Sequence, residues 1–411
     1  MCFMLNLRYT YTHTLHTLPR QTSSEASSHR DVALGATTVL SDAPRECRAT
    51  CQACANAANC PNSSLPQLIL AGTRKGGTTA LFTQLTLSGS LVAPDCTPEP
   101  SWTKIARRHT CVWRKEVRYF SIPNATQAGV DLCWYRRRYP CRAGRVGVDA
   151  SPDYFLLDDQ RVAKMAHALP LSARLVFLLR NPAERFYSAF NMASSSKKGD
   201  FSRWLSKAVA RHAGFSALSR SIARSIESHP KTTLPRHRAH ELRYEAFVRL
   251  LDAWLECAPQ CPREGSSPVN LFFSYGLYAS GLGRFAASFG WERMLVIKSE
   301  DFFADNWAVV KRIVRHAGLP EQPELEVKVR AGVRHAAAIN NGSIYGGHNR
   351  VRLRTPELRK LCDWYRPHNQ LLYAMEGVHR DFGWEAECDA RSLHLSSPSL
   401  LRAGRNLWSV I

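Results

Sequence analysis

A glycine-rich turn between an apolar run and a helix-forming segment is the first place where residue types and spacing point to chemistry. Residues 68–82 have the sequence LILAGTRKGGTTALF. Such turns direct backbone N–H groups and the positive end of a helix dipole at an anion. A Walker A loop would have lysine at position 78, but this chain has Thr78 there and carries Lys75 inside the turn. The sequence therefore predicts an anion site with a displaced lysine; a turn with a solvated lysine is the alternative.

A second basic residue closes an apolar run farther along the chain. The stretch RLVFLLRNPAERFYSAF covers residues 174–190, with Arg180 directly after the run and Ser188 in the segment that follows. Pro182 suits the first turn of a helix there, because its missing N–H is not needed at that position. A guanidinium offers a planar fork to phosphate and a hydroxyl adds a neutral donor. A plain surface position for Arg180 is the alternative.

Short apolar runs alternate with helix-forming stretches from residue 66 onward. The runs, rich in residues that favour strands, cover 68–71, 146–148, 175–179 and 294–297. Each is followed by a segment suited to a helix. Residues 299–318 are one such segment, with acids at the start, bases near the end and a closing Gly318. Strands separated by helices predict an α/β fold with a parallel sheet covered on both faces.

The domain organisation follows from composition. Residues 1–64 are polar and low in complexity, and are expected to be flexible. Residues 65–390 are predicted to form a single domain that contains a helical insertion at 193–265. Residues 241–258 are among the clearest helices of that insertion. Residues 391–411 form a tail without a clear pattern.

The charge of the chain favours anionic partners. Its 411 residues include 55 Lys plus Arg against 34 Asp plus Glu, giving a net charge of +21 and a pI near 9.7. Such a field attracts nucleic acid, acidic membranes or sulfated and uronate-bearing polysaccharides, while a solvated Arg-rich surface is the alternative. Neither zinc-finger spacing nor an aromatic-rich ribonucleoprotein motif is present, so no nucleic acid is expected as a partner.

Cysteines and sequons together indicate an oxidising, glycosylating compartment. The chain has 13 cysteines, and close pairs such as Cys133 with Cys141 and Cys257 with Cys261 favour nearby bridges. Zinc is the alternative for the cysteines within 51–60, but a second pair at finger spacing is missing. Acceptor sequons stand at Asn62, Asn124 and Asn341.

The first twenty residues do not resemble a secretory leader. Their apolar run is too short and too interrupted for a signal-peptide core. The sequence contains no run of about 18 apolar residues that would span a membrane. The chain is therefore expected to be either soluble or truncated upstream of an anchor, and the second is our hypothesis.

The turn GTRKGGTTAL resembles the 5′-phosphosulfate loop of sulfotransferases that use 3′-phosphoadenosine 5′-phosphosulfate (PAPS). In that family a strand ending in Arg and a Ser eight residues later hold the 3′-phosphate of the donor, and Arg180 and Ser188 match both positions. The resemblance implies a P-loop-like sheet, PAPS as donor co-substrate, and no metal. The donor-binding residues that it implies are Arg74, Lys75, Gly76, Gly77, Thr78, Thr79, Arg180 and Ser188, together with Arg350 or Arg352 in a late loop.

The acceptor side shows a second resemblance. KEVRYF, which begins at Lys115, is similar to the segment with the catalytic glutamate of heparan sulfate 3-O-sulfotransferases. The match implies Glu116 as general base, with Lys75 as the other catalytic residue. Pairing of Glu116 with Lys115 or a nearby Arg is the alternative. A rival base is Glu99 in PEPSW, which resembles KEPHWW of N-acetylgalactosamine 4-sulfate 6-O-sulfotransferase.

One position departs from the heparan-type pattern. Those enzymes have a catalytic lysine where this chain has Ala150, in VDASPDYF. The galactosamine 6-O-enzyme has EAS there, and it also shares the GLYA stretch at 276–279 with this chain. The departure therefore shifts the expected subfamily and leaves Lys75 as the main charge for the transferring group.

The resemblance implies sulfuryl transfer from PAPS to a hydroxyl of a carbohydrate, with a polysaccharide acceptor of glycosaminoglycan type. It also implies a location in the Golgi lumen, as a type II membrane protein or its soluble form. A P-loop kinase or NTPase is one rival, and Thr78 in place of lysine argues against it. A catalytically inactive polyanion-binding protein on the same fold is the other.

Overall fold

The computed structural model describes the central part of the chain. The described residues are 65–87, 91–96, 111, 115–122, 131–139, 146–194, positions within 241–255, 273–320, 325–330, 353–378 and 380–393. Predictions for residues 1–64, for most of 193–265 and for the tail beyond 393 lie outside them. The same holds for Glu99, Arg350, Arg352 and the three sequon asparagines.

Five parallel strands form one sheet. Its order is β2 (Leu91–Val92), β3 (Val146–Asp149), β1 (Leu68–Gly72), β4 (Arg174–Leu179) and β5 (Met294–Lys298). The four predicted strands and the α/β fold are thus confirmed. The sequence pattern does not predict β2, because two residues are too few to show a period.

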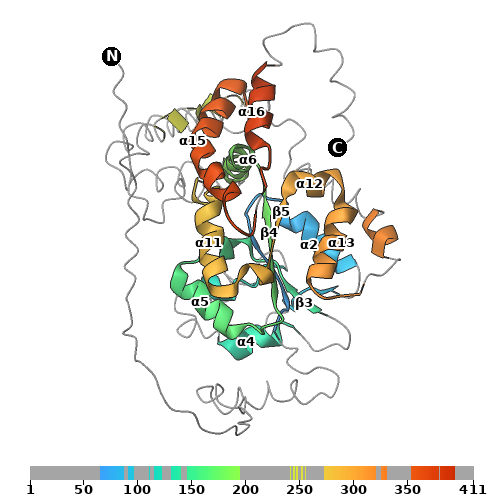
Figure 1. Cartoon of the computed structure of the whole chain (residues 1–411). Helices are drawn as coiled ribbons and strands as arrows, with labels where there is room; N and C mark the ends of the chain where they lie inside the picture. The colour runs from blue at the N-terminus through green and yellow to red at the C-terminus, as the bar shows by residue number, and fades with distance from the viewer. Residues whose placement is uncertain are drawn as a thin grey trace, which may run out of the picture. The chain divides into compact units, whose positions relative to one another are not determined.

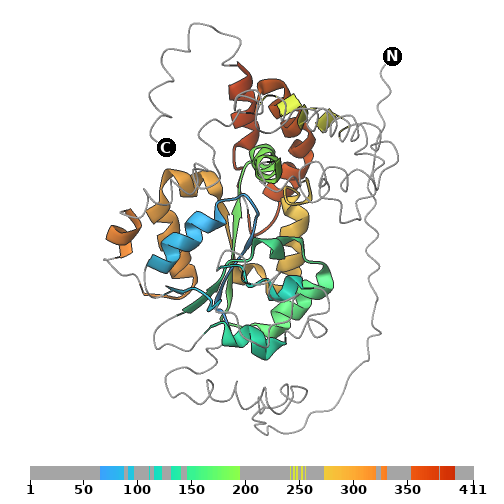
Figure 2. The ribbon, with the colours of Figure 1, turned by 180° about the vertical axis from the view of Figure 1, so that it is seen from behind.

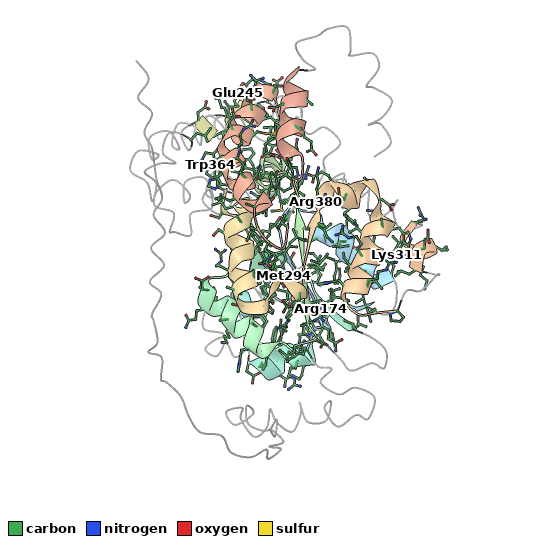
Figure 3. All side chains as sticks on the ribbon, in the orientation of Figure 1. Arg174, Glu245, Met294, Lys311, Trp364 and Arg380 are labelled. Atoms are coloured by element: carbon green, nitrogen blue, oxygen red, sulfur yellow. A yellow bond between two sulfur atoms is a disulfide. The ribbon has the colours of Figure 1, made fainter. Side chains whose placement is uncertain are left out.

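Helices cover both faces of this sheet, as predicted. Along β1, Leu68 and Leu70 pack into one apolar cluster and Ile69 and Ala71 into another, because successive side chains of a strand point to opposite faces. The covering helices are α2 (Thr78–Leu87) and α13 (Asn306–His316) on the first face, and α5 (Asp159–Ala168) and α11 (Tyr278–Phe289) on the second (Figures 1 and 2). Figure 3 shows the side chains between these layers, with Met294 of β5 among them. Burial on both sides stabilises the sheet.

A third apolar cluster joins α6 (Pro182–Ser194) to α15 (Thr355–Tyr373). Phe247 of the predicted insertion packs there against Phe186 of α6, with ring centroids 6.0 Å apart. The described positions between 241 and 255 are helical, as the pattern over 241–258 predicts. This cluster anchors α6, which begins directly after β4.

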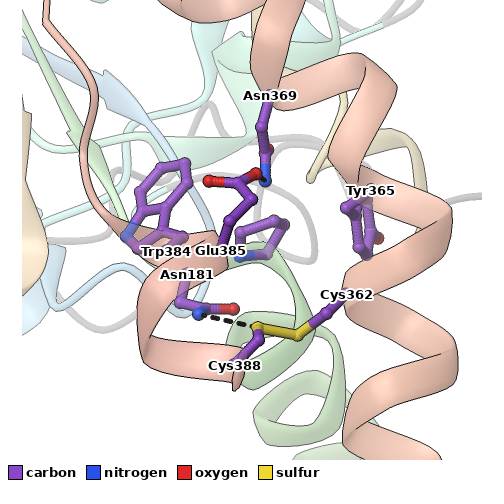
Figure 4. A pocket seen from close by; sticks show the side chains of 8 residues that line it. Asn181, Cys362, Tyr365, Asn369, Trp384, Glu385 and Cys388 are labelled. Carbon is purple, nitrogen blue, oxygen red and sulfur yellow. Dashed lines mark hydrogen bonds between the residues drawn. A yellow bond between two sulfur atoms is a disulfide. The ribbon is translucent and has the colours of Figure 1, made fainter. Parts of the chain in front are cut away.

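A disulfide between Cys362 and Cys388 joins α15 to α16 (Trp384–Leu393) (Figure 4). Asn181 donates from its amide nitrogen to Cys388 Sγ at 3.9 Å, at a small pocket that the disulfide helps to line. A second disulfide joins Cys96 and Cys111. The sequence pattern predicts neither bridge, and the close pairs that it favours lie outside the described residues or have side chains outside them. Disulfides are typical of an oxidising compartment.

Residues 299–318 form two helices where the sequence pattern predicts one. They are α12 (Ser299–Ala304) and α13, separated by Asp305. Asp305 has an extended backbone, and its carboxylate accepts from the Ala308 N–H at 3.0 Å, so it caps the second helix. Gly318 follows α13 with φ +68°, as expected of a residue that closes a helix.

The remaining described elements are short. They are α4 (Leu132–Arg137), helical residues 325–330, and the 3-10 turns η1 (Tyr119–Ser121), η2 (Pro152–Leu156) and η3 (Trp291–Arg293). Among the helices within the described ranges, none combines the length and the apolar character needed to cross a membrane.

Candidate active site

The glycine-rich turn lies across the carboxyl ends of β1 and β4. Thr73 donates its backbone N–H at 3.0 Å and its hydroxyl at 3.2 Å to the carbonyl oxygen of Leu178. The N–H of Gly76 donates to the Thr73 carbonyl at 3.0 Å, and its own carbonyl accepts from the Ser299 hydroxyl at 2.7 Å. These bonds hold the turn between β4 and α12, at the edge of the sheet where open α/β folds bind ligands.

Close packing makes glycine necessary at position 76. A Cβ there would lie 2.4 Å from the carbonyl oxygen of Leu178, a backbone atom near the carboxyl end of β4. Gly77 has φ +98°, and a Cβ there would lie 3.0 Å from the Phe303 ring. Lys75 has φ +68° although it is not glycine, a backbone conformation that persists only where surrounding contacts hold it.

The turn presents donors that suit a phosphate or sulfate group. The first N–H groups of a helix have no partner within it, and at α2 these belong to buried Thr78, exposed Thr79 and the residue after them. The helix dipole adds positive potential at the same place. Lys75 extends toward α6, where its Nζ lies 3.7 Å from Sδ of Met192. The residues present therefore fit the anionic end of the expected donor.

Contacts on both sides of Arg180 set its position after β4. Its carbonyl accepts from the Tyr278 hydroxyl at 2.6 Å. The next residue, Asn181, donates its N–H to Glu300 Oε1 at 2.9 Å, and its side chain caps the first turn of α6. The Arg180 guanidinium lies 3.5 Å from the Glu184 carboxylate, and its side chain is 28% exposed. The guanidinium is thus oriented yet open to an incoming anion.

The turn and the Arg180 segment meet at one edge of the sheet. The carbonyl that accepts the two hydrogen bonds of the turn stands on β4, two residues before Arg180. Ser188 is half-buried and lies one helical turn before Met192, the residue that Lys75 contacts. Residues four apart share a face of a helix, so Lys75 contacts the face of α6 that also carries Ser188.

Glu116 is buried and held by two cations. Nζ of Lys115 lies 2.8 Å from its Oε1, and Arg118 donates from Nε at 2.9 Å and from a terminal nitrogen to its Oε2. Lys115 also donates to the Ala150 carbonyl at 3.3 Å, and burial lowers the pKa of the Lys115 ammonium. The ion pairing that sequence analysis leaves as an alternative for Glu116 therefore occurs, although in the interior rather than at the surface.

Asp153 connects Glu116 to the glycine-rich turn. It accepts from Nη2 of Arg74 at 3.0 Å, with a further ion-pair contact to Nε, and from the Tyr275 hydroxyl at 2.8 Å. The guanidinium of Arg118 lies 3.3 Å from the same carboxylate. A continuous series of ion pairs thus runs from Arg74 through Asp153 and Arg118 to Glu116. The Arg74 side chain is thus engaged by a carboxylate.

Sequence analysis does not identify Arg118, Asp153 or Tyr275 as site residues. Each stands in or beside a motif: Arg118 two positions after Glu116, Asp153 in VDASPDYF, and Tyr275 before GLYA. The bonded partners of Asp153 lie 79 and 122 positions away along the chain. Their spacing carries no local pattern that could have revealed them.

Asp149, at the end of β3, is a fully buried carboxyl. It accepts from the hydroxyls of Tyr135 and Tyr154, each at 2.8 Å, and from that of Ser151. The Ser151 oxygen in turn accepts from the backbone N–H of Arg118 at 2.9 Å. Burial raises the pKa of Asp149 to about 6, although the three hydroxyls partly offset it. Asp149 therefore holds, through Ser151, the backbone that carries Arg118.

The stability of the fold is expected to depend on pH through Asp149. The ordinary pKa of an aspartate is 3.8. Between pH 3.8 and about 6 the folded chain therefore binds this proton more tightly than the unfolded chain does. The free energy of unfolding should fall by about 3 kcal/mol as the pH rises from about 4 through 6. Asp149→Asn cannot titrate and should lose that part of the dependence. Urea unfolding across this interval measures it, with Asp158→Asn, at the exposed cap of α5, as control. Equal pH dependence of wild type and Asp149→Asn would contradict the assignment.

The fold and the site define the class of protein to which the chain belongs. A parallel α/β sheet carries a glycine-rich turn at its carboxyl edge, with a basic residue after the neighbouring strand. Residues 65–335 match the family model described as "Sulfotransferase domain". The match covers more than half of the chain, and the chain belongs to this family. The resemblance drawn from the motifs is confirmed at that level.

The individual proteins that the chain resembles are distant in sequence. Over 132 residues the chain is 33% identical to "Bifunctional heparan sulfate N-deacetylase/N-sulfotransferase 1" of Caenorhabditis elegans, which is 32% of this chain and 13% of that protein. It is 23% identical over 332 residues to human "Heparan sulfate glucosamine 3-O-sulfotransferase 6", covering 78% and 73%. A sulfotransferase crystal structure from Alicyclobacillus acidocaldarius has 20% identity and a TM-score of 0.46, covering 78% of this chain and 98% of that one. The chain spans about an eighth of the length of the Caenorhabditis protein.

Proposed function

We propose that this chain transfers a sulfuryl group from PAPS to a hydroxyl of a carbohydrate acceptor. The observation that carries the proposal is the series of ion pairs from Arg74 of the glycine-rich turn through Asp153 and Arg118 to Glu116. In-line transfer requires a base close to the group that holds the donor. Family membership supports the proposal, and so do the names of the relatives, which include N- and 3-O-sulfotransferases of heparan sulfate.

The donor is assigned to the edge of the sheet where the turn meets α6. The turn is proposed to hold its phosphosulfate end, through Arg74, Lys75, Gly76, Gly77, Thr78 and Thr79. Arg180 and Ser188 are proposed to hold its 3′-phosphate, since a guanidinium after β4 and a hydroxyl on α6 provide charged and neutral donors. Arg350 or Arg352 remains our prediction for a loop that closes over the phosphates. No metal enters the proposal, because the protein supplies the positive charge.

Glu116 is the proposed general base. A carbohydrate hydroxyl is a poor nucleophile until its proton is removed. As the new oxygen–sulfur bond forms, the proton passes to Glu116. The bond between sulfur and the bridging oxygen breaks, and 3′-phosphoadenosine 5′-phosphate leaves. Lys75 and the N–H groups of the turn stabilise negative charge on the sulfonate and on that bridging oxygen.

A polysaccharide of glycosaminoglycan type is the proposed acceptor. The net charge of +21 favours an anionic polymer, and the relatives carry heparan sulfate in their names. The Golgi lumen is the proposed location. The two disulfides in the described part of the chain support an oxidising compartment.

Incubation with radiolabelled PAPS and a panel of desulfated glycans tests the proposal. We expect label in at least one glycan, and disaccharide analysis then identifies the sugar and the position. Labelling of none of the panel by a folded chain that binds 3′-phosphoadenosine 5′-phosphate would overturn it.

One observation favours a second candidate function, that of a catalytically inactive polyanion-binding protein. Glu116 is paired with Lys115 and Arg118 in the interior, an arrangement that also suits a carboxylate with a purely structural role. The signature of such a protein would be polysaccharide binding that Glu116→Gln leaves unchanged, without transfer of labelled sulfate.

Arg180→Ala is expected to weaken binding of 3′-phosphoadenosine 5′-phosphate about 10- to 150-fold, because a charge-assisted hydrogen bond contributes about 1.5–3 kcal/mol. Isothermal titration calorimetry measures the dissociation constant. The matched control is Arg174→Ala, since Arg174 begins β4 at the opposite end from Arg180 (Figure 3). Equal dissociation constants for the two variants would remove Arg180 from the donor site.

A further inference from the structure

The contacts of Glu116 raise a question that the proposed function leaves open. A general base needs a free lone pair directed at the acceptor hydroxyl. Both carboxylate oxygens of Glu116 are engaged, one by Lys115 and the other by Arg118. Because two nitrogens of Arg118 occupy Oε2, that oxygen can face an acceptor hydroxyl only after the Arg118 side chain moves.

Burial distinguishes the two cations. The Lys115 side chain is 2% exposed and bonds to the Ala150 carbonyl as well as to Glu116, so it has no room to leave. The Arg118 side chain is 18% exposed. Its departure would open one oxygen of Glu116 and leave the other paired with Lys115.

The backbone of Arg118 stays in place while its side chain can move. Its N–H donates to the Ser151 oxygen, and its left-handed backbone, with φ 58° and ψ 22°, immediately precedes η1. The guanidinium also lies 3.3 Å from Asp153, which already accepts from Arg74 and Tyr275. Asp153 is thus a second anion that Arg118 shares with Arg74. The Arg118 guanidinium can leave Glu116 without a change in the backbone.

We propose that Arg118 recognises an acidic group of the acceptor sugar and that this contact frees Glu116. The inference rests on the proposed function and narrows its substrate class to saccharides with a carboxylate or a sulfate ester near the target hydroxyl. Both anions match the planar fork of a guanidinium. When the acidic group draws Arg118 away, Oε2 of Glu116 becomes free to take the hydroxyl proton as the oxygen–sulfur bond forms. Arg118 is not consumed, so it determines specificity and does not take part in the bond changes.

The test compares acceptors that differ only in their acidic groups. One oligosaccharide backbone of heparan type is prepared in three forms: with uronic acid carboxylates only, with sulfate esters only after carboxyl reduction, and with neither. The full chain as wild type, Arg118→Gln and Arg118→Lys is assayed for kcat and KM with each form. Arg161→Gln, which removes a partly exposed arginine of α5, is the matched charge control.

Wild type is expected to favour at least one acidic form over the neutral form by about tenfold or more in kcat/KM, on the scale of one charge-assisted contact. In Arg118→Gln the difference between the acidic and the neutral forms should disappear. The kcat of this variant should fall on the acidic form and rise on the neutral form, because Glu116 is then released without a substrate anion. Arg118→Lys should keep part of the preference, and Arg161→Gln all of it. The form that wild type favours identifies carboxylate or sulfate as the recognised group.

The outcomes separate this inference from the proposed function. Equal transfer to all three forms by wild type would leave the proposed function standing and overturn the role of Arg118. A preference that Arg118→Gln retains would do the same. A merely structural role would lower kcat on every form, and that result also overturns the inference. Transfer to none of the forms by a folded wild type would overturn the inference, and it would overturn the proposed function as well only if the whole glycan panel also stays unlabelled.

Discussion

Replacing Glu116 with Gln is expected to lower kcat by more than about a hundredfold, the usual scale for loss of a general base. Glutamine has nearly the same shape but cannot accept the proton of the acceptor hydroxyl. The proposed donor contacts lie on the turn, at Arg180 and on α6, so 3′-phosphoadenosine 5′-phosphate should bind as in wild type. Single-turnover transfer from radiolabelled PAPS and calorimetry of the nucleotide measure the two effects separately.

The control for this substitution must account for stability. Lys115 and Arg118 lose their shared anion in Glu116→Gln, and breaking a buried ion pair costs about 3–5 kcal/mol. Rates are therefore compared at a temperature where circular dichroism shows the variant to be folded. Glu357→Gln changes another buried glutamate, on α15 and bonded to Tyr244, and should keep wild-type turnover. A Glu116→Gln variant within about threefold of wild type would exclude Glu116 as the base and turn attention to Glu99.

Gly76→Ala is expected to have the second large effect, because the added methyl group meets backbone rather than a flexible side chain. Its Cβ would lie 2.4 Å from the Leu178 carbonyl oxygen, so the turn must move away from β4. The hydrogen bonds of Thr73 to Leu178 and of Ser299 to Gly76 would weaken together. Overpacking of this kind costs about 1–3 kcal/mol in the free energy of unfolding.

The displaced turn should also bind the donor poorly. Binding of 3′-phosphoadenosine 5′-phosphate is expected to weaken by about tenfold or more, the equivalent of one lost charge-assisted hydrogen bond. Gly283→Ala on α11 is a matched control, because a Cβ there would meet only Met375 Cε, at 3.8 Å. That change should raise stability by about 0.5–1 kcal/mol, as alanine favours a helix interior. Urea unfolding and calorimetry on both variants provide the comparison. If Gly76→Ala matched Gly283→Ala in nucleotide binding, the close approach of the turn to β4 would have no role in binding.

Local patterns were sufficient to determine the core of the fold. The apolar runs at 68–71, 146–148, 175–179 and 294–297 predict the four longer strands, because a strand buried on both faces must be continuously apolar. The glycine spacing predicts the turn, since close packing at position 76 and a positive φ at position 77 exclude larger residues. The same patterns place Lys75 and Arg180 at strand ends. In a parallel sheet, the carboxyl ends of neighbouring strands meet at one edge.

The tertiary structure alone decided which partners each charged residue has. Sequence analysis names Glu116 but leaves its pairing open, and the structure joins it to Lys115 and Arg118 in the interior. Asp153 pairs with residues far away in the chain, and such pairing depends on how β1, η2 and the segment before α11 pack together. The Cys362–Cys388 bridge and the break at Asp305 were settled in the same way. Secondary structure follows from short-range periodicity, whereas the choice among many possible ion pairs follows from burial and distance, which only the packed chain defines.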